Sequence, residues 1–275
     1  LNVASYDGAT AATDESKLIV AGTFNSNGGT INISGQHTKV NTYAIDLSGA
    51  TLGGSSSTLI QLLATASNNE TMYLKLAGKT IGNLTINRPG QITQMTNASN
   101  GYIASGKTFT LTDGTFSAGA STLFVTGSMT LTAGTLTVSS GNITLDGGSQ
   151  TITNNSVGLC RLVLAGTGTK TFVSNPNFNS NVTLNSNVTL AIPASGTATL
   201  AASTTMALNG ILNLASGQTL ALGAGAQVTL AGSLSTDMLK VNANANVSMA
   251  NGAAITVNSG GLLQVRGTSA DNVST

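Results

Sequence analysis

The chain has 275 residues, only 7% of them charged, and a net charge of +1. Average globular proteins have roughly 25% charged residues. Nucleic acids and anionic membrane surfaces are bound through clusters of Lys and Arg, so this composition argues against both partners. No run of about 18 consecutive apolar residues occurs, so we expect no membrane insertion.

Residues 1–16 differ from the rest of the chain. Asp7, Asp14 and Glu15 lie there among Ala, Thr and Gly, with no periodic apolar face. We interpret this segment as an N-terminal arm. Because the chain begins with Leu1 rather than Met and shows no basic leader, we interpret it as a mature or trimmed product.

Residues 17–105 are rich in short apolar runs, but their spacing is irregular. The first predicted strand is Lys17–Phe24, and its run Leu18–Val20 is typical of a strand covered on both faces. Thr58–Ala64 is compatible with a short helix or a buried strand, because periodicity cannot separate the two in so short a run. Asn87–Gly90 predicts a turn. Further predicted strands are Thr30–Ser34, Tyr43–Leu47, Met72–Ala77 and Ile81–Ile86.

Residues 106–275 contain a recurring motif, in which alternating apolar and polar residues are followed by Gly, Asn or Ser. Phe109–Gly114, Met129–Gly134 and Leu212–Gly217 are clear copies. Alternation with period two predicts β-strands, and the punctuating residues predict turns. The predicted fold is all-β: a parallel β-helix (β-solenoid) of about seven or more coils, on the order of 20–25 residues each, preceded by the less regular β-rich part.

In such coils one apolar residue of each alternating pair faces the interior. The expected inward residues are Leu111, Leu131, Val138, Leu145, Ile152, Val163, Leu184, Leu190, Leu200, Leu214, Leu222, Leu230, Val241 and Val257.

The copies Ile143–Gly148, Gly210–Gly217 and Val228–Gly232 resemble the repeats of secreted bacterial β-solenoid proteins. That group includes autotransporter passengers and filamentous-haemagglutinin-type adhesins. The resemblance covers about 60–80% of the chain and implies the solenoid architecture. It implies an extracellular or cell-surface location in bacteria, but it does not select a function, since the group includes adhesins, fibres and carbohydrate-active enzymes.

Candidate catalytic and metal-binding groups are sparse, since the chain has nine acidic residues, one His and one Cys. Asp113 and Asp146 each precede a Gly at the end of a predicted strand, where Asp commonly caps a turn. His37 has no second His or carboxylate near it in the sequence, and Cys160 lies among apolar residues. We therefore expect no enzyme activity, no cofactor and no metal site.

Outward residues permit two further interpretations. Thr-x-Thr pairs such as Thr108/Thr110 and Thr197/Thr199 could order water at an ice surface, but their uneven spacing favours an ordinary β-surface. Asn-x-Ser/Thr sequons are frequent, so sugar on some of them is a possibility. The sequons begin at Asn32, Asn69, Asn83, Asn97, Asn142, Asn154, Asn181, Asn187, Asn246 and Asn272.

The two ends of a solenoid expose unpaired backbone groups above an apolar core unless they are capped. No amphipathic capping helix is evident near Leu262–Arg266. We therefore expect a structural subunit of an extracellular filament that self-associates head to tail, with an N-terminal strand added to the neighbouring subunit. The candidate interface residues are Leu18, Ile19, Val20, Phe24, Leu262, Leu263 and Val265.

Two other functions remain open. The chain could be an adhesin or stalk module of a larger bacterial surface protein that binds glycans or surfaces. It could also be a polysaccharide-active β-helix enzyme, although such enzymes need carboxylates held roughly 5–10 Å apart. Asp113 and Asp146 are 33 residues apart (146 − 113), which is not a whole number of the expected coils.

Overall fold

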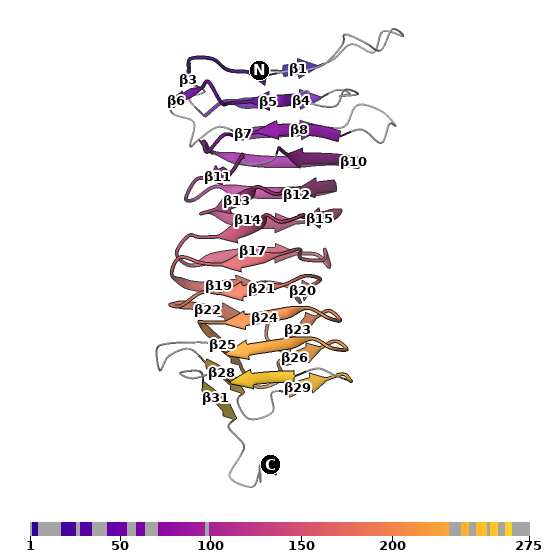
Figure 1. Cartoon of the computed structure of the whole chain (residues 1–275). Coiled ribbons are helices and arrows are strands. Elements are labelled where there is room, and N and C mark those ends of the chain that lie inside the picture. Colours follow the sequence, from indigo (N-terminus) through magenta and orange to yellow (C-terminus); the bar gives the residue numbers. More distant parts are fainter. Residues whose placement is uncertain are drawn as a thin grey trace. The chain divides into compact units, whose positions relative to one another are not determined.

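The computed structural model describes residues 2–4, 18–25, 28–34, 43–53, 59–63, 71–96, 99–230, 238–241, 246–251, 254–257 and 262–265. All regular elements among these residues are β-strands, and adjacent strands of the sheets pair in parallel (Figure 1). The predicted all-β solenoid is therefore confirmed. The chain divides into two compact units, Leu1–Thr144 and Leu145–Thr275. The sequence predicted a different division, based on the regularity of the repeat: an arm (residues 1–16), an irregular β-rich region (17–105) and a repeat region (106–275). That division remains a prediction.

The first unit builds one long sheet path, β1-β4-β7-β10-β12-β14, and β2, β5 and β8 lead into β10 beside it. A second sheet has the order β9-β11-β13, and β3 pairs with β6. The strands are β1 (Asn2–Ala4), β2 (Leu18–Ile19), β3 (Thr23–Asn25), β4 (Thr30–Ser34), β5 (Tyr43–Asp46), β6 (Thr51–Gly53), β7 (Leu59–Leu63), β8 (Thr71–Lys75), β9 (Thr80–Ile81), β10 (Asn83–Met95), β11 (Gly101–Ile103), β12 (Thr108–Ser117), β13 (Thr122–Val125), β14 (Ser128–Leu131) and β15 (Thr135–Thr137), while β16 (Asn142–Leu145) spans the boundary.

A column of aliphatic side chains forms the core of the first unit. Ile33, Leu62, Ile86, Leu111 and Leu131 occupy successive strands in direct register, and each is fully buried. Full burial of such a side chain contributes roughly 1.5–3 kcal/mol. Because parallel strands repeat the same inward position in every coil, the period-two pattern of the sequence becomes a continuous apolar stack.

The segment expected to form a turn, Asn87–Gly90, instead lies inside β10, so that prediction is wrong. Asn87 pairs with Asp113 and Ile92 with Thr115, which leaves residues 88–91 opposite Gly114 alone. The surplus residues form a bulge, which bends a strand without ending it. The other short elements agree better with the sequence: residues 59–63, which could have been a helix or a strand, form β7.

The second unit has three sheets whose strands follow the chain in order: β17-β19-β22-β25-β28-β31, β18-β21-β24-β27-β30 and β20-β23-β26-β29. Its strands are β17 (Gln150–Asn154), β18 (Leu162–Leu164), β19 (Gly168–Phe172), β20 (Asn177–Phe178), β21 (Val182–Leu184), β22 (Val188–Ala191), β23 (Thr197–Leu200), β24 (Thr205–Leu208), β25 (Ile211–Leu214), β26 (Thr219–Leu222), β27 (Gln227–Leu230), β28 (Met238–Val241), β29 (Asn246–Met249), β30 (Ala254–Val257) and β31 (Leu262–Val265).

Most of the expected inward residues are buried, with the exceptions of Val138, Val163 and Val257. Val163 faces outward because its neighbours Leu162 and Leu164 both take inward positions, and alternation leaves the residue between them outside. Val138 follows β15 and is partly exposed. Val257 does lie at an inward position, in register with Leu230. It is nevertheless 46% exposed, because within the described residues no further strand pairs with the other side of its strand.

Candidate subunit-interface edges

The first three strands of the first unit each pair on one side only within the described residues. β1, which lies within the expected arm, pairs with β4, β2 pairs with β5, and β3 pairs with β6. The predicted strand Lys17–Phe24 is thus split into β2 and β3. The outer edges of β1, β2 and β3, here named the N-terminal edge, present backbone groups of the kind to which another strand can add.

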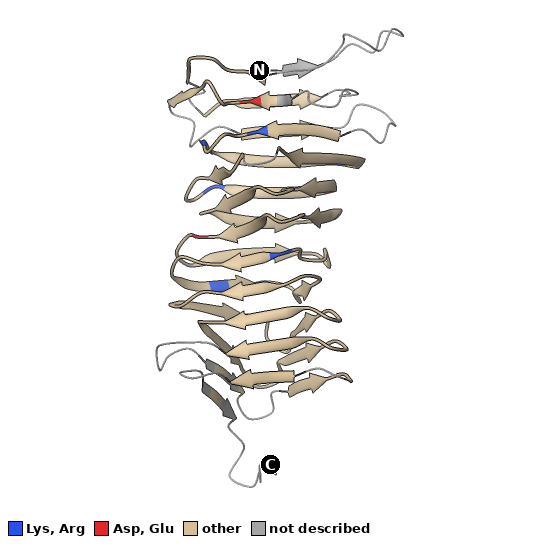
Figure 2. Ribbon diagram, in the orientation of Figure 1, with Lys and Arg blue, Asp and Glu red and all other residues tan. Residues whose placement is uncertain are grey.

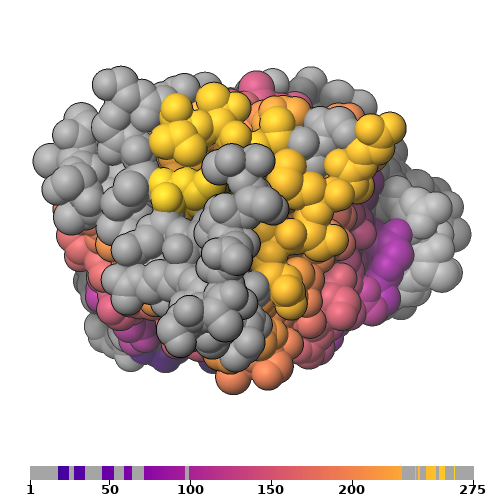
Figure 3. Space-filling view, turned by 90° about the horizontal axis from the view of Figure 1, so that it is seen from below, coloured from indigo at the N-terminus to yellow at the C-terminus, as the bar shows by residue number. Residues whose placement is uncertain are grey.

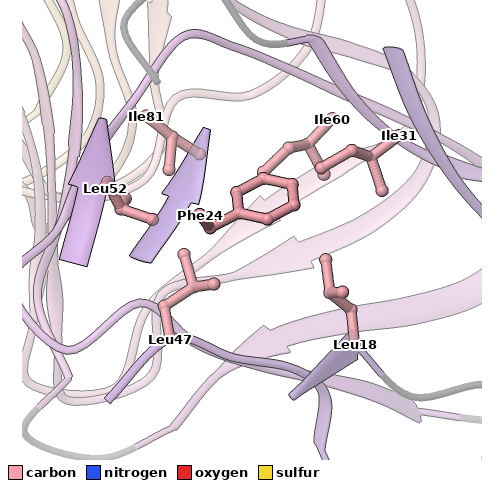
Figure 4. Close-up of a pocket in the computed structure, with 7 residues that line it drawn as sticks. All are labelled: Leu18, Phe24, Ile31, Leu47, Leu52, Ile60 and Ile81. Atoms are coloured by element: carbon pink, nitrogen blue, oxygen red, sulfur yellow. The ribbon is translucent and has the colours of Figure 1, made fainter. Parts of the chain in front are cut away.

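An apolar pocket lies just inside the N-terminal edge (Figure 4). Leu18 and Phe24 point into it from β2 and β3, and aliphatic side chains of the following strands complete it. Its volume is about 10 Å³, roughly the room for one water molecule. It is therefore a small packing defect and has no space for an organic ligand. The lining residues are Leu18, Phe24, Ile31, Leu47, Leu52, Ile60 and Ile81.

Ile19 faces outward, in contrast to the prediction that Leu18–Val20 is covered on both faces. It is 64% exposed and lies in register with Asp46. Asp46 in turn accepts a hydrogen bond from Lys75 Nζ at 3.2 Å and from the N–H and Oγ–H of Ser48 at 2.9 and 2.6 Å. Partial burial raises the pKa of Asp46, but the hydrogen bonds from Ser48 and Lys75 outweigh it and the pKa is lowered overall. Val20 is partly exposed, and its N–H donates to the carbonyl of Asp46.

The last strands of the second unit, β29, β30 and β31, form the C-terminal edge, and each again has a strand neighbour on one side only among the described residues. Met249, Val257 and Leu263 are 48%, 46% and 39% exposed. Part of this edge is visible in the space-filling view, where the last described strands are yellow (Figure 3).

These three exposed residues are not ordinary surface residues, because each continues a buried column of the core. The columns are Leu200–Leu222–Met249, Leu208–Leu230–Val257 and Leu190–Leu212–Leu239–Leu263. Every member before the last is at most 3% exposed. The C-terminal edge therefore exposes the end of the apolar core on all three sheets at once.

Leu262 and Val265 complete the set of interface residues expected from the sequence. Both lie in β31, in register with Met238 and Val241 respectively. Their side chains lie outside the described part of the chain. All the candidates expected from the sequence except Val20 lie in edge strands, and their role at an interface stays a prediction. Met249 and Val257 were not among them, and their period-two spacing from Val247 and Ile255 was the available signal.

Other polar groups show structural contacts. Asp113 Oδ1 accepts the N–H of Gly114 at 2.6 Å, and burial raises the pKa of the Cys160 thiol to about 12.

Charged residues are few and scattered in Figure 2. No group of three or more His, Cys, Asp or Glu side chains that could hold a metal occurs within the described residues. His37 lies outside them.

The structure also reveals two buried cations that sequence reasoning missed, Arg88 and Lys170, both fully buried. Arg88 donates to the carbonyl of Ile92 at 2.6 Å inside the β10 bulge. Lys170 and Phe172 are two residues apart in β19 and both face inward. The alternation in Gly168–Phe172 was the available signal, since it places Lys170 and Phe172 on one face.

Comparison of the chain with protein families, with curated proteins and with solved structures found no match. Among the described residues, no helix has the length and apolarity to cross a membrane.

Proposed function

We propose that the chain is a structural subunit of an extracellular protein filament, in which the C-terminal edge of one copy accepts the N-terminal edge of the next. The supporting observation is that three buried columns end in the exposed side chains of Met249, Val257 and Leu263. An edge of this kind combines unpaired strands with the end of an apolar core, and another parallel strand layer would cover both.

The N-terminal edge is a suitable occupant, because its strands are parallel to those they pair with and carry apolar residues at inward positions. Leu18 is in register with buried Ile45, and Phe24 points into the apolar pocket. Contact between two different edges of identical copies is heterologous, so it propagates unless rotation closes a ring. Strand addition would supply backbone hydrogen bonds along with burial of the apolar ends.

The outward surface of the second unit also supports a fibre. Thr197, Thr219 and Asn246 form one outward column, and Ala221 and Ser248 belong to the adjacent one. These side chains are small and uncharged, so neighbouring filaments would meet little electrostatic repulsion. They provide no paired carboxylates of the kind that glycoside hydrolysis requires.

A second candidate, an adhesin or stalk module that binds glycans, is favoured by one feature of the first unit. The rings of Tyr102 and Phe124 stack with centroids 4.7 Å apart and an interplanar angle of 7°. They occupy paired outward positions on β11 and β13 and are partly exposed. Aromatic side chains offer an apolar face beside a polar hydroxyl, a combination that suits a sugar ring. In this alternative, further coils of a longer chain would cover the C-terminal edge.

Negative-stain electron microscopy of the purified chain over a range of concentrations tests the proposal. Uniform filaments with a regular axial repeat are expected, whereas isolated particles at every concentration would overturn it and lead to glycan-binding assays on Tyr102→Ala. A variant lacking residues 1–24 should remain unassembled. If this variant still forms filaments, the N-terminal edge is not the occupant.

A further inference from the structure

The exposed ends of the three core columns at the C-terminal edge differ in their chemistry. Val257 and Leu263 are aliphatic, whereas Met249 ends its column with a thioether. In that column Leu200 and Leu222 are 0% and 3% exposed, and Met249 is 48% exposed. The edge therefore presents a methionine to solvent at a position that the two preceding coils fill with buried leucine.

Burial protects the other sulfur-containing side chains that the structure describes. Four methionines are at most 1% exposed: Met72, Met95, Met129 and Met206. Cys160 is 8% exposed, and burial raises the pKa of its thiol to about 12, so almost no reactive thiolate forms near neutral pH. The side chain of Met238 lies outside the described part of the chain. Within that part, Met249 is the accessible sulfur.

Exposure decides which methionines react, because oxidation of a thioether requires contact with an oxidant in the solvent. A lone pair of Met249 Sδ attacks the outer oxygen of a hydroperoxide, the O–O bond breaks and an S–O bond forms. The hydroxyl proton moves to the departing oxygen, so the peroxide leaves as an alcohol, or as water when it is hydrogen peroxide. The sulfur loses two electrons and the peroxide gains them.

The product no longer suits an apolar interface. Oxidation converts a flexible apolar side chain into a polar one whose new oxygen accepts hydrogen bonds. Met249 is in register with Leu222 and shares one face of β29 with Val247, and neither neighbour has a side-chain donor. An apolar layer placed over the sulfoxide would therefore leave its oxygen without a hydrogen bond, which is unfavourable.

We propose that Met249 is an oxidation site that controls assembly: peroxide converts it to the sulfoxide on a free C-terminal edge, and the modified edge no longer accepts the N-terminal edge of another copy. This inference rests on the proposed function. Inside a filament of that kind the next copy covers Met249, so only unassembled chains and the terminal subunit are modified. Oxidation then stops growth without dissolving existing filaments, and enzymatic reduction of the sulfoxide restores growth.

Hydrogen peroxide treatment of the purified, unassembled chain, followed by trypsin digestion and mass spectrometry, tests the site. Cleavage after Lys240 separates Met249, in peptide 241–266, from Met238, in peptide 171–240. Each added oxygen raises the mass of a peptide by about 16 Da. Peptide 241–266 should gain it at least about tenfold faster than peptides 40–75 and 108–161, which contain buried methionines. Equal rates in all three peptides would overturn the proposal.

Sedimentation and electron microscopy of the same samples test the effect on assembly. The concentration of chain that stays unassembled should rise at least about tenfold after oxidation and return after treatment with methionine sulfoxide reductase. Met249→Leu should assemble like the native chain and be insensitive to peroxide, because leucine fills the equivalent positions of the preceding coils. The matched variant Met238→Leu should assemble and remain sensitive.

The outcomes separate this inference from the proposed function. An untreated chain that never forms filaments would overturn both. Filaments that form from the untreated chain, and form equally well after complete oxidation of Met249, would overturn the inference alone. Protection by Met238→Leu in place of Met249→Leu would also overturn it, since the sensitive sulfur would then lie outside the exposed column ends.

Discussion

The side chain of Asn175 bridges two coils of the second unit, where its Oδ1 accepts the backbone N–H of Thr197 at 3.0 Å, 22 residues further along the chain. The same relationship recurs at other coil corners. In each case the amide oxygen of an Asn accepts the N–H of a Thr at the start of a strand in the following coil. The other pairs are Asn83–Thr108, Asn100–Thr122 and Asn181–Thr205.

Replacement of Asn175 by Ala is expected to lower the free energy of unfolding by about 1 kcal/mol, because it removes one hydrogen bond to a backbone donor. Urea unfolding followed by circular dichroism measures the change. Asn155→Ala is the matched control, since Asn155 is exposed and should tolerate the substitution. Equal effects of both substitutions would mean that the bridge between coils contributes nothing.

A second prediction concerns Gly114, opposite the β10 bulge. Its φ is +93°, and a Cβ there would lie 2.2 Å from the carbonyl oxygen of Arg88. Gly114→Ala should therefore lower the free energy of unfolding by more than about 2 kcal/mol, through backbone strain and steric overlap together. At Gly148 an added Cβ would meet no atom of the described part of the chain within 4 Å, so Gly148→Ala is the control. A Gly114→Ala variant as stable as the control would contradict this account.

The regular part of the fold was readable from the sequence because one physical rule governs it. In β25, Leu212 and Leu214 are buried on either side of the exposed Asn213, and a residue two places away must face the same side. Parallel stacking then repeats that face in the next coil. The rule fails for Val163, since a continuous apolar run does not reveal which of its residues lie inside.

The bulge at Arg88 could not be derived from periodicity, and for Lys170 periodicity indicates the inward face but not the groups that the side chain contacts. Pro89 and Gly90 normally indicate a turn, but here they lie in a bulge, with Gly90 at φ +69°, and β10 pairs with strands on both sides before and after it. The environment of Lys170 depends on carbonyl groups about 20 residues earlier, and such contacts have no local sequence signal. Leu18 and Leu263 could be placed in edge strands from the sequence, because the first and last strands of a repeat follow from element order alone.

The carboxamide of Asn154 provides a third prediction. The side chain is fully buried, and neither Oδ1 nor Nδ2 has a hydrogen-bond partner among the residues that the structure describes. An amide buried without partners loses its hydration and gains nothing in return. Asn154→Val should raise the free energy of unfolding by about 1 kcal/mol, since the hydrogen bond from the backbone N–H of Asn154 to Ser174 is kept.

Thermal and urea unfolding measure this effect, and Asn155→Val is the exposed control. A decrease in stability for Asn154→Val would show that the amide is satisfied. Burial of Asn154 also argues against sugar at this sequon, because an attached glycan must reach solvent.

Asp46 should make the first unit less stable in acid. Its pKa in the folded state lies below the ordinary value of 3.8. The unfolded state therefore binds a proton more readily than the folded state. The contribution of Asp46 to the free energy of unfolding is thus present at pH values above the ordinary pKa, and it is lost as the pH falls through the folded pKa. In Asp46→Asn this contribution is absent at every pH. The difference in urea midpoint between native chain and variant should shrink between about pH 6 and pH 2, and a difference independent of pH would contradict the assigned hydrogen bonds.

Leu263 should control assembly, because it is the exposed end of a buried column and Leu239 in the preceding strand is fully buried. In Leu263→Glu, assembly would place a carboxylate against the apolar first layer of the next copy, and burial of an unpaired charge costs several kcal/mol. Filaments should therefore be lost while the far-ultraviolet circular dichroism spectrum is kept.

Val173 is the control, since it is 50% exposed but lies next to β19 rather than at an edge strand. Electron microscopy and sedimentation should show filaments of Val173→Glu and particles of Leu263→Glu. Loss of filaments in both variants would point to lateral contacts, and persistence in both would exclude the C-terminal edge as the interface.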